Sequence, residues 1–293
     1  MLVETIVTVR EKGGDPRTLR LYGQEVNLTT AAIARMNLYL HDIEDFQVLR
    51  GDTLRDPKFR TGSGDIERFD VVVANPPFSL KKWGADRWAS DPRAICAVPP
   101  AGNGDFAWIQ HMVSSMDPAS GRVGVVMPHG ALFRGNVEQR IRQCLIEMDL
   151  LDAVVGLPPN LFYSTSIPAC LLIFRASKPP ERKRHVLFVD GSARFTKGKN
   201  QNRMAGDDID AVVAAFRSGH DPDGEGGVGV RLVPAADIEA AGWDLNITRY
   251  IAAAAGETVG VETALAALRD SQTDLREAEA RLAERLREAG YES

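Results

Sequence analysis

The chain of 293 residues is long enough for one large α/β domain, or for one domain with an appendage. Its 44% hydrophobic content is that of a globular protein with a core, and its net charge of −5 excludes a basic surface over the whole molecule. No apolar run is long enough to cross a membrane and the opening residues have no signal-peptide pattern, so we expect a cytoplasmic protein.

Two strands are predicted ahead of the first helix. Apolar residues alternate over residues 2–9, which favours a strand, and a second short strand over residues 19–22 leads to Glu25. A carboxylate just beyond a strand is suited to bind two adjacent ribose hydroxyls, as acidic groups do in dinucleotide-binding folds. The alternative for Glu25 is a solvated side chain where a helix begins.

A helix and another strand follow. Thr29 or Thr30 can cap a helix that runs to about His41. The side of this helix that we expect to face the core carries Ile33, Met36, Asn37 and Leu40. Residues 46–49 predict a strand that ends before Asp52, whose alternative role is a turn aspartate that binds its own backbone.

Residues 69–78, Phe-Asp-Val-Val-Val-Ala-Asn-Pro-Pro-Phe, form the most informative stretch of the chain. The valines predict a strand that is buried on both faces of a parallel sheet. Asn75-Pro76-Pro77 ends this strand, because proline has no N–H for a ladder. Ligands bind at the carboxyl edge of such sheets. The alternative is a Pro-Pro turn that merely packs Phe78 in the core.

The Asn-Pro-Pro-Phe group suits methyl transfer to a planar nitrogen. An exocyclic amino group is a poor nucleophile, because its lone pair is delocalised into the ring. The amide oxygen of Asn75 and the carbonyl of Pro76 can accept its two N–H bonds and turn the lone pair toward the methyl group. Phe78 offers a face on which a flipped base can stack, while Pro77 stiffens the turn.

The loop after this motif combines positive charge with aromatic rings. Lys81, Lys82 and Arg87 are interleaved with Trp83 and Trp88, as binding to a DNA backbone and to flipped bases requires. An ordinary polar loop that packs two tryptophans explains the same residues equally well. Both interpretations stay open.

The rest of the chain alternates between helices and strands and closes with a long helix. Strands are predicted over residues 121–127, 150–156, 168–174 and 185–189, the third of them antiparallel near the edge of the sheet. Leucines recur every seven residues in a helix over 262–289, which is the pattern of a coiled-coil seam, and helical packing on the same chain fits it too. The cysteines, Cys96, Cys144 and Cys170, have no metal-ligand spacing, so we expect buried, reduced thiols and no metal site.

Several further motifs join the central one in a fixed order. They are residues 21–27 (Leu-Tyr-Gly-Gln-Glu-Val-Asn), 51–54 (Gly-Asp-Thr-Leu), 75–79 (Asn-Pro-Pro-Phe-Ser), 104–112 (Gly-Asp-Phe-Ala-Trp-Ile-Gln-His-Met), 127–130 (Met-Pro-His-Gly) and 244–250 (Asp-Leu-Asn-Ile-Thr-Arg-Tyr). With these motifs the chain resembles the modification (M) subunit of type I restriction–modification systems, an adenine-N6-specific DNA methyltransferase, over most of residues 20–250.

The resemblance implies an α/β fold: a Rossmann-like, S-adenosylmethionine-dependent methyltransferase sheet with a long carboxyl-terminal helix. It implies that Glu25 binds the ribose of the cofactor, that Asp52 binds its adenine amino group, and that Asn75 also contacts it. The catalytic group would be Asn75, Pro76, Pro77 and Phe78. Phe162 or Tyr163 would form the second face of the base pocket.

The resemblance also implies an organisation and a set of partners. Residues 1–177 would form the catalytic domain, residues 178–255 an extension of it, and residues 256–293 a helical segment that docks onto the specificity (S) subunit. The restriction (R) subunit would complete the complex. DNA would be the substrate, with its target sequence read mainly by a partner, since no recognition domain is visible.

One motif of the family is missing from this chain. The Asp-Pro-x-x-Gly-x-Gly loop that precedes the ribose-binding acid in the family has no counterpart ahead of Glu25, so we expect a chain that lacks the amino-terminal part of an M subunit. Two alternatives therefore stay open. One is an inactive remnant that only binds its subunit partners, and the other is a protein glutamine methyltransferase, which shares the Asn-Pro-Pro chemistry.

Overall fold

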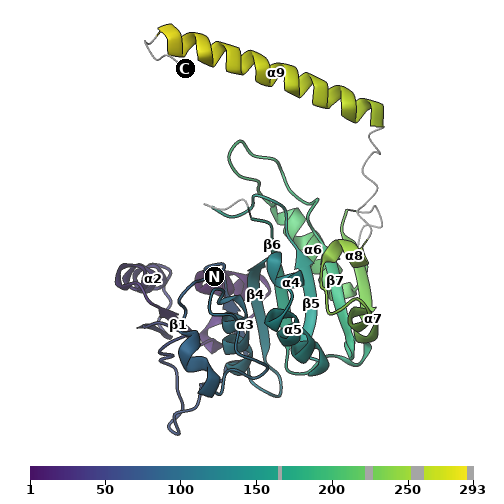
Figure 1. Ribbon diagram of the computed structural model, residues 1–293. Coiled ribbons are helices and arrows are strands. Elements are labelled where there is room, and N and C mark those ends of the chain that lie inside the picture. The colour runs from purple at the N-terminus through teal and green to yellow at the C-terminus, as the bar shows by residue number, and fades with distance from the viewer. Residues whose placement is uncertain (164–166, 222–226, 252–260, 289–293) are drawn as a thin grey trace. The chain divides into compact units, whose positions relative to one another are not determined.

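The computed structural model describes residues 1–163, 167–221, 227–251 and 261–288. The chain divides into two compact units, Met1–Ala252 and Ala253–Ser293. All eight strands of the described residues lie in the first unit, which has the predicted α/β architecture, and the second contains helix α9 (Val261–Glu288) (Figure 1).

The strands of the first unit form two sheets. β1 (Leu21–Glu25) and β2 (Phe46–Arg50) pair in parallel in the smaller one. The larger sheet has six strands in the order β3-β4-β6-β5-β7-β8. These strands are β3 (Val71–Ala74), β4 (Arg122–Pro128), β5 (Leu151–Gly156), β6 (Ala169–Arg175), β7 (His185–Asp190) and β8 (Gly229–Pro234). Because β3, β4, β5 and β7 run one way and β6 and β8 the other, four carboxyl ends share one edge.

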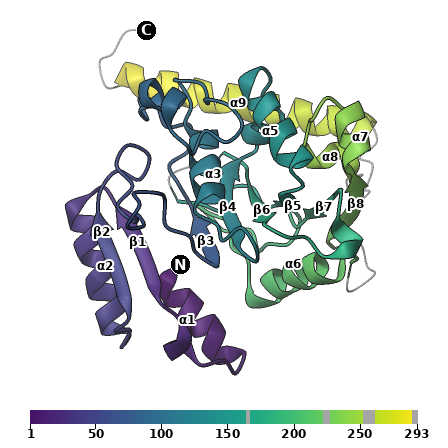
Figure 2. The same ribbon diagram turned by 90° about the horizontal axis from the view of Figure 1, so that it is seen from below.

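Helices cover both faces of the larger sheet. On one face α3 (Asp105–Ser114) and α5 (Val137–Glu147) pack on the sheet with residues of the short α4 (Gly130–Phe133), α7 (Ala235–Ala240) and α8 (Ile247–Tyr250). On the other face α6 (Gly206–Ser218) packs on β5 and β7. Figure 2 shows α6 on the opposite side of the strands from α3 and α5. Two-sided burial explains the apolar runs at residues 153–155 of β5 and 186–189 of β7.

The smaller sheet is covered by α1 (Leu2–Glu11) and α2 (Leu28–Leu40). The strand predicted over residues 2–9 is wrong. Leu2, Val3 and Ile6 have the spacing of one helix face, and they pack on the cluster that contains Leu21, so the helical period prevails over the weak alternation. Asn27 caps α2, since its side-chain oxygen accepts the amide hydrogens of residues 29 and 30.

The predicted inward side of α2 is also wrong. Ala31 and Leu38 are buried against the small sheet, and the small side chain of Ala31 lets the helix lie close to it. The side predicted to face the core, with Ile33, Met36, Asn37 and Leu40, is exposed.

β3 forms where it was predicted, but it is not buried on both faces. It lies at an edge of the larger sheet, and Val71 and Val73 are 63% and 43% exposed. An apolar run indicates a strand but does not reveal its neighbours. β6 is antiparallel as predicted, yet it lies between β4 and β5 rather than near an edge, where both faces of the strand find partners.

Cys96 and Cys144 form a disulfide, so the prediction of reduced thiols is wrong for these two and holds only for the buried Cys170. The loop that carries Cys96 returns to α5 across 48 residues, a proximity that sequence spacing does not reveal. Within the described residues, no cluster of His, Cys, Asp or Glu could hold a metal ion. None of the described helices is long and apolar enough to cross a membrane.

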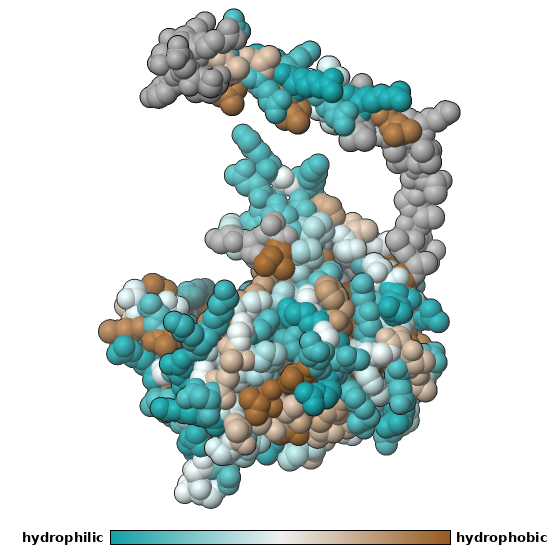
Figure 3. Space-filling model, viewed as in Figure 1, coloured by the Kyte–Doolittle hydropathy of each residue, from teal (hydrophilic) through white to brown (hydrophobic). Residues whose placement is uncertain are grey.

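The second unit contains the long helix that the leucine spacing predicted. Leu265, Leu275 and Leu282 of α9 are exposed. Figure 3 shows apolar side chains spaced along α9 among hydrophilic ones. Taken by itself, α9 therefore presents exposed leucines among those of its side chains that the structure describes.

Candidate active site

Three polar side chains follow the ends of β1, β2 and β3 at one edge of the strands. Glu25 ends β1, Asp52 comes two residues after β2, and Asn75 follows β3 directly. Near the amino ends of β1 and β3, the rings of Tyr22 and Phe69 are 5.1 Å apart. Beyond the carboxyl ends, Arg55 follows β2 and Lys82 follows β3, and the Arg55 guanidinium donates to the Lys82 carbonyl. Because β1 and β2 are parallel, β1 and β3 run in the same direction, and the three predicted residues lie at one edge.

The Asn75 side chain is exposed and has no hydrogen-bond partner among the described residues. Pro76 beside it is buried, Pro77 is exposed and Phe78 is half-buried. The turn is thus anchored at Pro76 while the Asn75 amide remains available to a ligand.

A buried carboxylate fixes the far side of this turn. The Ser79 amide donates to Oδ1 of Asp105 at 2.7 Å, and the Gly104 amide donates to the Leu80 carbonyl at 3.0 Å. Asp105 is 1% exposed, so its charge must be compensated. Ser79 itself has φ of +51°, a left-handed conformation that a serine adopts only where its surroundings hold it.

Arg134 compensates the charge of Asp105. Its guanidinium pairs with Asp105 of α3 and with Glu138 of α5, which is buried as well. Burial alone would lower the pKa of Arg134, but its bonds to Glu138 and Asp105 raise that pKa instead. Sequence reasoning did not identify this link between the start of α3 and the turn. The only available signal was an aspartate at the start of a helix otherwise made of apolar and neutral residues.

Glu25 and Asp52 each use one carboxylate oxygen for local backbone bonds. Oε1 of Glu25 accepts the Asn27 amide at 2.8 Å. Oδ1 of Asp52 accepts the amides of Leu54 and Arg55 at 3.0 and 3.1 Å, which is the turn role that was the alternative for this residue. The second oxygen of Asp52 lies 3.7 Å from Nε of Arg55. The backbone role leaves one oxygen of each carboxylate for a ligand.

A buried arginine holds the loop that carries Asp52. Arg93 donates to the carbonyls of Thr53 and Leu54 at 2.9 and 2.6 Å and pairs with Asp91. Its guanidinium also lies over the Trp88 ring and 3.2 Å from Nδ1 of His111. Burial lowers the pKa of His111 to about 3, and the charge of Arg93 adds to this effect. Sequence reasoning did not identify this network.

The loop after the motif has a charged surface and an aromatic interior. Lys81, Lys82 and Arg87 are exposed. Trp83 and Trp88 are each 1% exposed and pack edge to face at 5.1 Å, so they are core residues and not stacking platforms. Of the two interpretations left open, the structure therefore supports the polar loop that packs two tryptophans.

Phe162 and Tyr163 follow β5, whose carboxyl end lies at the same edge as that of β3. Phe162 is half-buried and Tyr163 is 87% exposed. A second polar loop holds this segment, since Asn202 donates to the Asn160 and Pro159 carbonyls at 2.9 and 2.8 Å. In the described residues neither ring contacts Phe78. The structure thus brings these residues to the edge without joining them to the turn.

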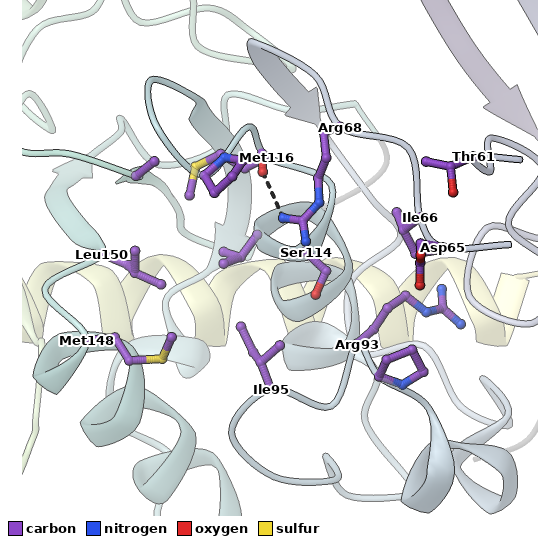
Figure 4. Close-up of a pocket in the computed structure, with 14 residues that line it drawn as sticks. Thr61, Asp65, Ile66, Arg68, Arg93, Ile95, Ser114, Met116, Met148 and Leu150 are labelled. Carbon is purple, nitrogen blue, oxygen red and sulfur yellow. Dashed lines mark hydrogen bonds between the residues drawn. The ribbon is translucent and has the colours of Figure 1, made fainter. Parts of the chain in front are cut away.

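A pocket of about 500 Å³ lies elsewhere, near the amino ends of β3 and β5. Figure 4 shows Arg68, Met116, Met148 and Leu150 around it, with the Arg68 guanidinium donating to the Met116 carbonyl at 3.1 Å. None of the predicted site residues lines this pocket. It occupies the opposite end of the strands from Asn75, so the turn and not the pocket is the candidate active site.

Comparison with known proteins places the chain among DNA methylases. Residues 1–258 match the family model described as N-6 DNA Methylase. The chain is 31% identical to the HindI type I restriction enzyme methylase subunit of Haemophilus influenzae, over 99% of this chain and 66% of that subunit. It is 34% identical to the MjaVII methylase subunit of Methanocaldococcus jannaschii, over 86% of this chain but only 43% of the relative.

A solved structure agrees with these relatives. The crystal structure of a type I restriction–modification methyltransferase subunit from Streptococcus thermophilus matches with a TM-score of 0.74 and 34% identity, over 84% of this chain and 51% of that one. The chain thus spans 43% to 66% of the length of these subunits.

Proposed function

The chain belongs to the N-6 DNA methylase family, and from the site at the end of β3 we propose that it transfers a methyl group from S-adenosylmethionine to N6 of a flipped adenine in DNA, as part of a type I modification subunit. The observation that carries the proposal is the Asn75 amide, which is exposed and free of partners in the described part of the chain, on a turn anchored by Pro76 and Asp105. A free amide on an anchored turn is suited to a ligand that brings its own hydrogen-bond donors.

The turn would act on the adenine amino group. Oδ1 of Asn75 and the Pro76 carbonyl would accept its two N–H bonds, so that the N6 lone pair points away from the ring plane. Formation of the new N–C bond, with the S–C bond breaking, would move positive charge onto N6, and both acceptors would stabilise it. N6 would then lose one proton to solvent. Phe78, with Phe162 or Tyr163 opposite, would hold the base by stacking.

The donor would lie against the ends of β1 and β2. S-adenosylmethionine supplies an electrophilic methyl group when bound. The oxygens of Glu25 and Asp52 that make no backbone bond fit hydroxyl and amino donors, so Glu25 would hold the ribose and Asp52 the adenine amino group, with Asn75 beside them. The two carboxylates are hydrogen-bond acceptors, and the ribose hydroxyls and adenine amino group of the cofactor are the donors that they fit.

DNA and protein partners would contact other surfaces. Lys81, Lys82 and Arg87 are exposed next to the turn and would contact phosphates. The exposed leucines of α9 favour docking of residues 256–293 onto a specificity subunit, with a restriction subunit completing the assembly. Residues 1–177 would be the catalytic domain and 178–255 its extension. A chain that modifies chromosomal DNA would act in the cytoplasm.

One observation favours a second candidate, a chain that only binds its subunit partners. It spans 43% of the MjaVII relative, so groups that the chemistry needs can lie in the part that is not matched. Labelled S-adenosylmethionine, offered with unmethylated DNA and with protein acceptors, separates the candidates. Label on adenine N6 supports the proposal, label on protein supports a glutamine methyltransferase, and no transfer supports a binding role.

A further inference from the structure

Basic residues gather in the segment between β7 and α6. Residues 191–206 contain four cations, Arg194, Lys197, Lys199 and Arg203, and no aspartate or glutamate. The whole chain, by contrast, has a net charge of −5. A local excess of positive charge on an otherwise acidic chain marks a surface that attracts a polyanion.

This segment folds into a short hairpin. Thr196 and Arg203 exchange both backbone hydrogen bonds, at 2.8 and 3.1 Å, and form an antiparallel bridge. A Cβ on Gly198 would lie 2.0 Å from the Gln201 carbonyl oxygen, so the turn at the tip requires glycine. We call residues 196–203 the basic hairpin. Because it follows the carboxyl end of β7, it lies at the edge of the sheet that carries the candidate active site.

The cations of the basic hairpin are not neutralised by the protein. Lys197, Lys199 and Arg203 are exposed, and no carboxylate in the described ranges forms an ion pair with any of them. An anionic ligand can therefore approach these side chains without displacing an intramolecular partner. When lysine and arginine neutralise the phosphates of DNA, condensed counterions are released, and that release drives binding.

Three hydrogen bonds hold the basic hairpin against the loop that follows β5. Asn202 donates to the carbonyls of residues 160 and 159 at 2.9 and 2.8 Å, from its backbone amide and its side chain. The side chain of Gln201 donates to the carbonyl of residue 161 at 2.5 Å. Phe162 comes directly after these three carbonyls. The basic hairpin is thus fixed next to a residue that we assign to the base pocket.

The basic hairpin lies at a distance from Asn75 that suits a DNA duplex. β7 is the fourth strand along from β3 in the order β3-β4-β6-β5-β7. Since neighbouring strands are about 4.8 Å apart, the ends of β3 and β7 are separated by roughly 19 Å. Along a duplex this span corresponds to about five or six base pairs, at 3.4 Å each. Phosphates beside a target adenine can therefore reach the basic hairpin while the adenine occupies the turn at Asn75.

We propose that the basic hairpin binds the phosphate backbone of duplex DNA on one flank of the target adenine, with Lys197 and Lys199 as its main contacts. DNA as the partner follows from the proposed function, on which this inference rests. Contacts to phosphates carry no sequence information, so the basic hairpin positions the duplex and does not select the target. Its connection to the loop before Phe162 couples the grip on the backbone to the wall of the base pocket.

The salt dependence of DNA binding tests this role. A labelled duplex several helical turns long is titrated with the full chain at a series of salt concentrations, and fluorescence anisotropy gives the affinity. The double variant Lys197→Gln, Lys199→Gln should bind about tenfold more weakly at low salt. The slope of log K against log salt should also fall in magnitude by about 2, because each lost phosphate contact removes about 0.9.

A charge-matched control excludes a general effect of net charge. Lys12→Gln with Lys183→Gln removes two charges at exposed positions, and Lys183 lies just ahead of β7, at the opposite end of that strand from the basic hairpin. This control should bind as the parent does. An equal loss in the control, an unchanged salt slope in the hairpin variant, or a parent chain that does not bind the duplex would overturn the proposal.

Gly198→Ala separates the shape of the basic hairpin from its charge. It keeps both lysines but cannot keep the turn, so binding should weaken several-fold; binding at the parent's affinity would contradict a preformed contact surface. The outcome is distinct from that of methyl transfer. Binding through the basic hairpin without transfer would contradict the proposed function alone, whereas transfer with an unchanged salt slope in the lysine variant would contradict this inference alone.

Discussion

The Ser79 amide donates a 2.7 Å hydrogen bond to the buried carboxylate of Asp105. This bond joins the residue after the Asn-Pro-Pro-Phe turn to the first turn of α3. Through Arg134 and Glu138, the same carboxylate connects the turn to α5. The position of the Asn75 amide therefore depends on an ion-pair chain in the protein interior, although the amide itself is exposed.

Replacing Asp105 tests whether these ion pairs stabilise the fold around the turn. Asp105→Ala leaves the Ser79 amide and one side of Arg134 unpaired, and we expect a loss of about 3 kcal/mol in the free energy of unfolding. Asp210→Ala on the exposed face of α6 is the matched control and should change it by less than about 0.5 kcal/mol. Urea unfolding measures both. Equal stabilities of the two variants would show that the bond to Ser79 carries no free energy.

His111 should make the fold sensitive to acid. Its pKa is lowered to about 3 by burial and by Arg93, while the unfolded chain takes up the proton near pH 6.5. Its contribution is therefore fully present above pH 6.5 and is lost as pH falls toward 3, by about 2 kcal/mol between pH 6.5 and 4.5. His111→Gln should flatten this dependence, and His220→Gln, at an exposed position, should not. Urea midpoints across this range decide between them.

The Cys96–Cys144 disulfide should stabilise the first unit. It closes a loop of 48 residues between the segment ahead of α3 and α5, and a loop of that length contributes about 2–4 kcal/mol. Adding a reductant should lower the free energy of unfolding by that amount. The Cys144→Ser variant should be insensitive to reductant, whereas Cys170→Ala should keep the full effect. A parent chain that responds to reductant no more than Cys144→Ser would contradict the expectation.

A substitution at Asp52 distinguishes a role of this side chain in the turn from a role in cofactor binding. Asp52→Asn keeps Oδ1 as an acceptor for the Leu54 and Arg55 amides but replaces the other oxygen by a donor. We therefore expect S-adenosylmethionine to bind about tenfold more weakly with the thermal midpoint nearly unchanged. Asp56→Asn, whose side chain only pairs with Lys58 at the surface, should bind as the parent does. Calorimetric titration gives the affinities, and equal values for both variants would assign Asp52 to the turn alone.

The sequence showed which segments form strands, but it was less informative about which strands lie next to one another in the sheet. The valine run of residues 71–73 predicts β3 correctly, because β-branched residues fit a strand whatever pairs with it. Its place at an edge depends on which strands lie beside it, and β-propensity carries no information about that. Ile33 and Met36 show the same limit, since a helical stripe does not say whether anything covers it.

In the candidate site, too, local features were predictable from the sequence and long-range contacts were not. Asn75, Glu25 and Asp52 were predicted as site residues because each lies at or just beyond the end of a predicted strand, in a motif that the chain shares with the family it resembles, and local sequence records both. Asp105 and Arg93 were missed, since their partners, Ser79 and the Thr53 carbonyl, lie 26 and 40 residues away. Cys96 and Cys144 likewise meet only through the fold. Long-range polar contacts leave no periodic trace in a sequence.

The central claim is that the Asn75 amide activates adenine N6, and methyl transfer by an Asn75 variant tests it most directly. In the assay with labelled S-adenosylmethionine and unmethylated DNA, Asn75→Ala should lower the rate of N6-methyladenine formation by about 100-fold or more. The affinity for S-adenosylmethionine should change much less, and Asn160→Ala, on the loop that follows β5, serves as the control. A variant that methylates DNA within a few-fold of the parent rate would contradict the account.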